Sequence, residues 1–178
     1  KIITQNKLGE IVQFRIMYLH GSYINKRPMT WRLKKGTGGA LVDLAPHVLD
    51  LTKFLLGPFE VNSYKKIKKM PDREVDDMAF MLCKTQNNAD GYIEVSRIST
   101  GSVDDLRIEI HGTKGAIKWN LEKLNFFDLF LKEENYEGFK RVPFFNNKDD
   151  DSDFPPAKVS NGWLMAHTHC LYNFIKEI

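Results

Sequence analysis

The chain has 178 residues, of which 42% are hydrophobic and 28% are charged. This length and composition are enough for one hydrophobic core, so we expect a single globular domain. The formal net charge is only +3 with both signs mixed, which argues against nucleic acid or an anionic membrane as a partner. No apolar run approaches the ~20 residues of a membrane helix and no signal-peptide pattern begins the chain, so a cytoplasmic location is predicted.

Strand-forming segments dominate the chain, with one helix after the first strand and another at the C-terminus. The first helix is expected to begin after glycines in the segment 36–39 and to end at Gly57-Pro58, a typical stop signal. The last helix is expected from residue 163, after a cap at Asn161. Strands are expected within the segments 9–23, 60–69, 76–85, 90–100, 104–120, 123–131 and 138–145. The acidic, proline-bearing segment 146–162 is expected to be a surface loop.

This order of elements predicts an α+β fold with a large antiparallel or mixed sheet, its helices packed on one face. The segment 78–83, Met-Ala-Phe-Met-Leu-Cys, is apolar on both alternating sides. Because the helices cover only one face, we expect the other to pack against a second copy in a homo-oligomer, or against a further domain. Cys83 and Cys170 both lie in apolar segments and are expected to be free, buried thiols.

The first helix carries an unusual combination of an aspartate, a proline and a histidine. Asp43 and His47 are four residues apart, on the flank of the apolar stripe, and a carboxylate beside an imidazole suits proton transfer. Pro46 removes one helical hydrogen bond at a cost of about 3 kcal/mol, which predicts a kink or a tight turn near Ala45. The ordinary alternative is a surface i,i+4 pair without chemistry. The apolar stripe consists of Leu41, Leu44, Val48, Leu51 and Leu55.

Other candidate residues lie before this helix and near the C-terminus. Tyr23, Trp31 and Arg32 offer an aromatic and cationic rim suited to a ligand rich in hydroxyl groups. His167 lies within the apolar stripe of the last helix, where a core histidine is the favoured interpretation and a substrate contact the alternative. His169, on the opposite side, is expected to be solvated. A metal site ranks last, because no HxH or HExxH spacing supports it. Its ligands would be Asp43, His47, Asp50 and His167.

Several segments together resemble the C-terminal domain of the glucose-fructose oxidoreductase/inositol dehydrogenase (Gfo/Idh/MocA) family. In chain order they are GEIVQFRIMY, WR, GTGGALVDLAPHVLDLTKFLLG, IEIHGTKGAIKWN and NGWLMAH. Proteins of that family join an N-terminal Rossmann domain to an α+β domain whose open sheet usually mediates oligomerisation. They oxidise or reduce hydroxyl and carbonyl carbons of sugars, cyclitols and related polyols with NAD or NADP. The resemblance therefore implies a sugar or polyol oxidoreductase.

The resemblance also implies roles for individual residues. His47 would be the general acid/base, and Asp43 would bind the reacting substrate and orient His47. Arg32, Trp31 and His167 are looser candidates for substrate contact, because substrate-side residues vary within such families.

Two of the family's motifs are missing from the chain. There is no GxGxxG after a strand, and there is no Glu-Lys-Pro whose lysine would stand beside the histidine. In that family both motifs belong to the Rossmann domain, so we expect residues 1–178 to be a single substrate-binding and oligomerisation domain that lacks the Rossmann domain. The start at Lys1 also suggests a fragment or processed product. We expect the full-length protein to use NAD or NADP, and this chain alone to hold no cofactor and to be inactive. The alternative is a non-catalytic sugar-binding or self-association module.

Overall fold

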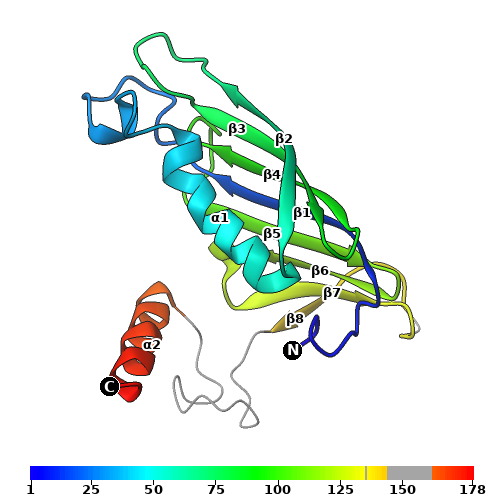
Figure 1. The fold of residues 1–178 in the computed structure, drawn as a ribbon. Helices are drawn as coiled ribbons and strands as arrows, with labels where there is room; N and C mark the ends of the chain where they lie inside the picture. Colours follow the sequence, from blue (N-terminus) through cyan, green and yellow to red (C-terminus); the bar gives the residue numbers. More distant parts are fainter. Residues whose placement is uncertain (135, 144–161) are drawn as a thin grey trace.

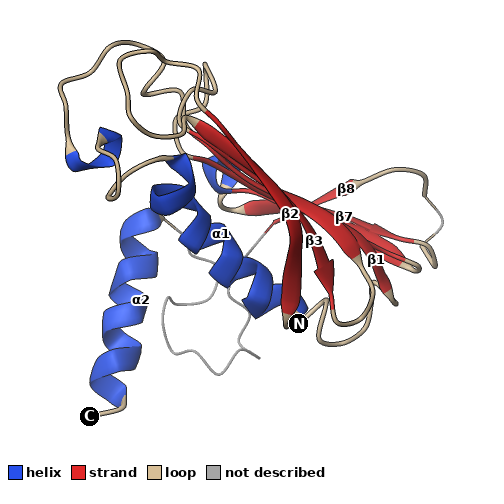
Figure 2. Ribbon diagram, turned by 45° about the horizontal axis from the view of Figure 1, so that its top comes forward, coloured by secondary structure: helices blue, strands red, loops and turns tan. Residues whose placement is uncertain are grey.

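The computed structural model describes residues 1–134, 136–143 and 162–178, which form one eight-stranded sheet and two helices (Figure 1). The α+β class is confirmed, and Figure 2 shows both helices on the same side of the sheet. The helices are α1 (Ala40–Leu56) and α2 (Trp163–Lys176), with short 3₁₀ turns at Trp31–Leu33 and Leu121–Lys123. The strands are β1 (Ile11–Leu19), β2 (Phe59–Ile67), β3 (Met78–Thr85), β4 (Asp90–Ser96), β5 (Asp105–Gly112), β6 (Gly115–Asn120), β7 (Phe126–Leu131) and β8 (Lys140–Pro143).

The sheet is mixed, with the strand order β2-β3-β4-β1-β5-β6-β7-β8. After β1, helix α1 carries the chain over the sheet to the edge strand β2, and the predicted β3–β4 hairpin leads back toward the centre. Strand β4 therefore lies beside β1 in the parallel sense, whereas all other neighbours are antiparallel. This one parallel pair places the C-terminal ends of β1 and β4 at the same edge of the sheet.

Helix α1 packs against the part of the sheet formed by β1 to β4. The predicted apolar stripe is confirmed, and its most deeply buried members are Leu44 and Val48. The helix continues through Pro46, so of the two expected alternatives, a kink or a turn near Ala45, the turn is wrong. Val42 and Pro46 both lie on the exposed side of α1, where water can hydrogen-bond the carbonyl that lacks an amide donor.

Helix α2 presents a different face to the sheet from the one that its sequence suggested. The stripe expected in the core is exposed, and Cys170 with it, so the prediction of a buried Cys170 is wrong. The side of α2 that lines the cavity against the sheet carries Met165, Ala166 and His169 instead. The expected cap at Asn161 lies outside the described residues, and the helix begins after Gly162. In the part of the chain that the structure describes, no helix is long and apolar enough to cross a membrane.

The sheet face opposite the helices carries both apolar and charged side chains. In β3, Ala79, Met81 and Cys83 are buried toward the helices, whereas Leu82 on the other face is 58% exposed. Farther along this face, the Arg15 guanidinium donates a hydrogen bond of 3.0 Å to Glu109. The alternation predicted for residues 78–83 is therefore present, with an exposed apolar region beside a region of ion pairs.

Candidate active site

The glycines before α1 allow three backbone segments to meet. A Cβ added to Gly38 would overlap the carbonyl of Arg32, and one added to Gly39, at φ 109°, would lie 2.5 Å from an Asp76 carboxylate oxygen. Asp76 caps the helix from the loop before β3: its carbonyl accepts the Ala40 amide at 3.0 Å, and its Oδ2 accepts the Leu41 amide at 2.8 Å. The glycines thus hold the first turn of α1 against the 3₁₀ turn at residues 31–33.

Asp43, in the first turn of α1, is anchored by two arginines. Its Oδ2 accepts a hydrogen bond from Arg32 Nε at 3.2 Å and another from Arg97 Nη2. The Asp43 side chain is only 11% exposed, so these charged partners offset the cost of its burial. Within the described residues, no hydrogen bond to Oδ1 is formed, which leaves that oxygen as an acceptor. Burial lowers the pKa of Arg97, which follows β4 directly.

His47 lies one turn farther along α1 and is exposed. Among the described residues no hydrogen bond or ion pair joins it to Asp43, so the expected carboxylate–imidazole pair is not present. Asp43 is instead held on the side of Arg32 and Arg97, whose guanidinium groups make charge-assisted hydrogen bonds to Oδ2. The imidazole instead meets the ring of Tyr18 edge to face, with 5.9 Å between centroids and 87° between planes.

Trp31 and Arg32 lie beside Asp43. The Arg32 guanidinium is stacked 4.4 Å from the centroid of the Trp31 indole, which is 49% exposed. Beneath them, the Tyr23 ring lies 5.4 Å from the Arg97 guanidinium. The structure thus brings the predicted Trp31 and Arg32 together with Asp43 on one side of the N-terminal end of α1.

Three further side chains at this edge of the sheet were missed by the sequence analysis. The Tyr18 hydroxyl donates a hydrogen bond to Asp104 Oδ1 at 2.7 Å, and His20 Nε2 lies 3.4 Å from the same oxygen. Burial and then the bond to Asp104 raise the pKa of Tyr18 to about 12. Burial and the charge of Arg97 lower the pKa of His20. Tyr18 has a signal in the sequence, because it shares the helix-facing side of β1 with the buried Phe14 and Ile16.

His167 does not join this group. It is exposed on α2, where its ring contacts Trp163 at a centroid distance of 4.2 Å, so its interpretation as a core histidine is wrong. No hydrogen bond, ion pair or ring contact connects it to Asp43 or His47 within the described chain. Its assignment as a substrate contact therefore stays a prediction without structural support.

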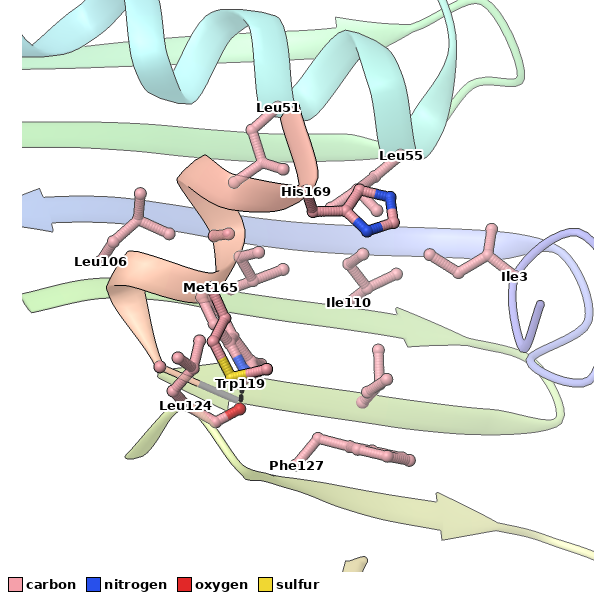
Figure 3. A pocket seen from close by; sticks show the side chains of 14 residues that line it. Ile3, Leu51, Leu55, Leu106, Ile110, Trp119, Leu124, Phe127, Met165 and His169 are labelled. Atoms are coloured by element: carbon pink, nitrogen blue, oxygen red, sulfur yellow. Dashed lines mark hydrogen bonds between the residues drawn. The ribbon is translucent and has the colours of Figure 1, made fainter. Parts of the chain in front are cut away.

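A large cavity lies elsewhere, between α1, α2 and the strands β5 to β7 (Figure 3). It has a volume of about 600 Å³ and an almost entirely apolar lining. Leu51 and Leu55 of α1 and Met165 of α2 point into it, and so does the half-buried His169, which was expected to be solvated. The cavity contains neither Asp43 nor His47 and offers little to bind hydroxyl groups. By contrast, the cavity that Asp43 lines has a volume of only about 10 Å³.

Neither a metal nor a dinucleotide fits the described residues. No group of three or more His, Cys, Asp or Glu side chains in this part of the chain is arranged to hold a metal ion. Within the described residues a glycine-rich segment leads into α1, and there the Asp76 carbonyl accepts the Ala40 amide and the Asp76 carboxylate accepts the Leu41 amide, so these amides are not open to a pyrophosphate.

Comparison with known proteins gives the family. The model of the GFO/IDH/MocA C-terminal domain matches residues 1–118. The chain belongs to this family. Levoglucosan dehydrogenase of Pseudarthrobacter phenanthrenivorans is 30% identical over 170 residues, which cover 80% of this chain and 44% of that protein. Inositol 2-dehydrogenase of Rhizobium meliloti is 30% identical over 122 residues, covering 66% of this chain and 35% of the relative.

Solved structures of the GFO/IDH/MocA family agree with this fold. A levoglucosan dehydrogenase in complex with NADH and levoglucosan has a TM-score of 0.87 and 26% identity, covering 99% of this chain and 52% of that one. An inositol dehydrogenase homologue of Azotobacter vinelandii, complexed with NAD⁺, has a TM-score of 0.81 at 20% identity, which shows the shared fold. The chain thus spans about half the length of these relatives, which are dehydrogenases of sugars and cyclitols.

Proposed function

We propose that this chain is the substrate-binding and oligomerisation domain of an NAD(P)-dependent oxidoreductase that acts on a sugar, cyclitol or related polyol. The observation that carries the proposal is the site at the N-terminal end of α1, where Arg32 bonds to Asp43 and stacks on the exposed Trp31 indole, and the exposed His47 imidazole lies one helical turn from Asp43. Its chemistry matches what the names of the relatives describe, the dehydrogenation of levoglucosan and of inositol.

Each residue would contribute to the proton side of the reaction or to binding. Oxidation of an alcohol removes a hydride from carbon and a proton from oxygen, and a nicotinamide nucleotide bound by the full-length protein would supply the hydride acceptor. His47 would take the hydroxyl proton, because its exposed imidazole forms no competing hydrogen bond in the described chain. Asp43 would accept a hydrogen bond from a substrate hydroxyl at Oδ1, since its Oδ2 is held by Arg32 and Arg97. The Trp31 indole would pack against the C–H face of the sugar.

The shallowness of the site supports a further domain. Small-molecule sites are usually pockets of roughly 300 Å³ or more, and the cavity beside Asp43 has a volume of about 10 Å³. A second domain placed over α1 would enclose the substrate between His47 and residues of that second domain. The same domain would bind the nucleotide. This is the proposed role of an N-terminal Rossmann domain in the full-length protein.

The catalytic part of the proposal is tested in the full-length protein. With levoglucosan, myo-inositol or D-apiose and either NAD or NADP, we expect reduced nucleotide to form with at least one pair. His47→Ala should then lower kcat by about 100-fold or more, the scale of general acid/base catalysis. Asp43→Asn should raise KM, whereas Asp50→Asn, the same change on an exposed part of α1, should change neither constant. Full activity of His47→Ala would refute the assignment, and polyol binding without turnover would favour the non-catalytic alternative.

The self-association part rests on the sheet face opposite the helices. Leu82 is 58% exposed in the apolar region of that face. We expect Leu82→Lys to lower the oligomeric mass in light scattering, whereas Phe54→Lys on the exposed side of α1 should leave it unchanged. An unaltered mass for Leu82→Lys would exclude this region of the sheet as the interface.

A further inference from the structure

Tyr18 is the only partner that the described structure gives to the His47 imidazole. The two rings meet edge to face, with a centroid distance of 5.9 Å and an interplanar angle of 87°. Such pairs prefer this arrangement because the positive edge of one ring lies over the negative face of the other. An exposed imidazole on a helix otherwise samples several rotamers, so this contact restricts its orientation.

Tyr18 is itself held firmly. Its hydroxyl donates a 2.7 Å hydrogen bond to Asp104 Oδ1, on the loop that leads into β5. On the other side its ring is tilted at 55° against His20, with 4.8 Å between centroids. Its backbone lies in the middle of the sheet, paired with Val95 of β4 and Leu106 of β5. A side chain fixed at its hydroxyl, its ring and its backbone is a rigid support for a mobile neighbour.

We propose that Tyr18 is the positioning residue for His47, and that Asp104 acts through Tyr18 by fixing its hydroxyl. The inference rests on the proposed function of His47. It replaces the expected orientation of His47 by Asp43, because no hydrogen bond or ion pair joins these two side chains in the described part of the chain. Tyr18 thereby supplies the orientation that proton transfer requires, without itself touching the substrate.

The experiment is a double-mutant cycle in the full-length enzyme. An edge-to-face aromatic pair corresponds to roughly a two- to tenfold effect. We therefore expect Tyr18→Leu to lower kcat by roughly that factor with little change in KM, and Tyr18→Phe, which keeps the ring, to lose less. In a His47→Ala background, Tyr18→Leu should cost nothing further, because the residue through which it acts is gone. The matched control is Tyr64→Leu, an exposed tyrosine on β2, which should leave kcat unchanged.

The outcomes separate this inference from the proposed function. If His47→Ala keeps full activity, the assignment of His47 fails, and the positioning role fails with it. If His47→Ala is impaired but Tyr18→Leu costs the same factor in both backgrounds, only the positioning role is overturned, and Tyr18 is merely structural. A crystal structure of Tyr18→Leu gives a readout independent of activity: we expect the His47 side chain to occupy more than one rotamer, and one unchanged rotamer would contradict the inference.

Discussion

The cap that Asp76 provides to α1 is expected to contribute measurably to stability. No side chain of the helix's own N-cap residue, Gly39, is available, and the Asp76 carboxylate accepts the Leu41 amide at 2.8 Å instead. Loss of such a cap costs about 1 kcal/mol, and the negative charge at the helix N-terminus adds about 0.3–1 kcal/mol. Asp76→Ala should therefore lower the free energy of unfolding by about 1.5 kcal/mol. Asp76→Asn keeps an acceptor and should lose only about 0.5 kcal/mol.

The measurement is urea unfolding at two salt concentrations, checked by thermal melting. For a chain of this size the alanine variant should melt about 3–6 °C lower. Added salt should shrink the small loss in Asp76→Asn, because only the charge part is screened. Asp50→Asn, on the exposed part of α1, serves as the control and should change stability by less than about 0.5 kcal/mol. Equal losses in the alanine and asparagine variants would refute the hydrogen-bond argument, and no loss in either would show that α1 needs no cap.

Three other predictions concern the packing of α1, the reactivity of the two cysteines and the charge of Asp105. Leu44→Ala shortens a side chain that is 2% exposed and should lower the free energy of unfolding in urea by about 2–5 kcal/mol. Its control is Val42→Ala, at a side chain 55% exposed on the same helix, which should lower that free energy by less than about 0.5 kcal/mol. Iodoacetamide at pH 8 should label the exposed Cys170 and leave Cys83 unmodified, because burial raises the pKa of the Cys83 thiol to about 11. Mass spectrometry of the labelled native protein measures this, and labelling of Cys83 instead of Cys170 would contradict the prediction. Hydrogen bonds from the Arg107 guanidinium lower the pKa of Asp105 from its ordinary value of 3.8. The ionised carboxylate therefore stabilises the folded state at pH values above 3.8. This stabilisation is lost as the pH falls through the lower pKa of the folded state. Asp105→Asn should therefore cost more stability at neutral pH than in acid, and a constant difference across that range would contradict the assignment.

Local patterns in the sequence were sufficient for most of the fold. The alternation along β3 and the stripe of α1 follow directly from side-chain periodicity, and the glycines and Gly57-Pro58 mark the ends of α1. Helix α2 shows where periodicity is not enough, because its most apolar side is exposed and the side that faces the sheet carries Met165, Ala166 and His169. Pro46 does not end the helix, although its cost is about 3 kcal/mol, because the packing of the apolar stripe stabilises α1 and water can bind the Val42 carbonyl on the exposed side.

The site was predicted only where its residues are close in sequence. Asp43 and His47 are four residues apart, and Arg32 is eleven before Asp43 and bonds to it. Arg97 is 54 residues from Asp43, and no spacing rule predicts that the two meet. The predicted carboxylate–imidazole pair is not formed, and Asp43 Oδ2 is bonded instead to Arg32 and to Arg97, a partner distant in sequence. A pair inferred from spacing within one helix is therefore conditional on what the rest of the fold brings beside it.

The parallel pairing of β1 with β4 explains why the missed residues lie together. Tyr18 pairs with Val95 in this register, so Tyr18 and His20 leave β1 at the edge where Arg97 leaves β4. The antiparallel neighbour β5 begins at that same edge, which brings Asp104 to the Tyr18 hydroxyl. An antiparallel β1–β4 pair would place Arg97 at the far end of the strand, away from Asp43. The strand order that α1 creates by crossing the sheet therefore assembles both supports of the site, the arginines at Asp43 and the tyrosine at His47.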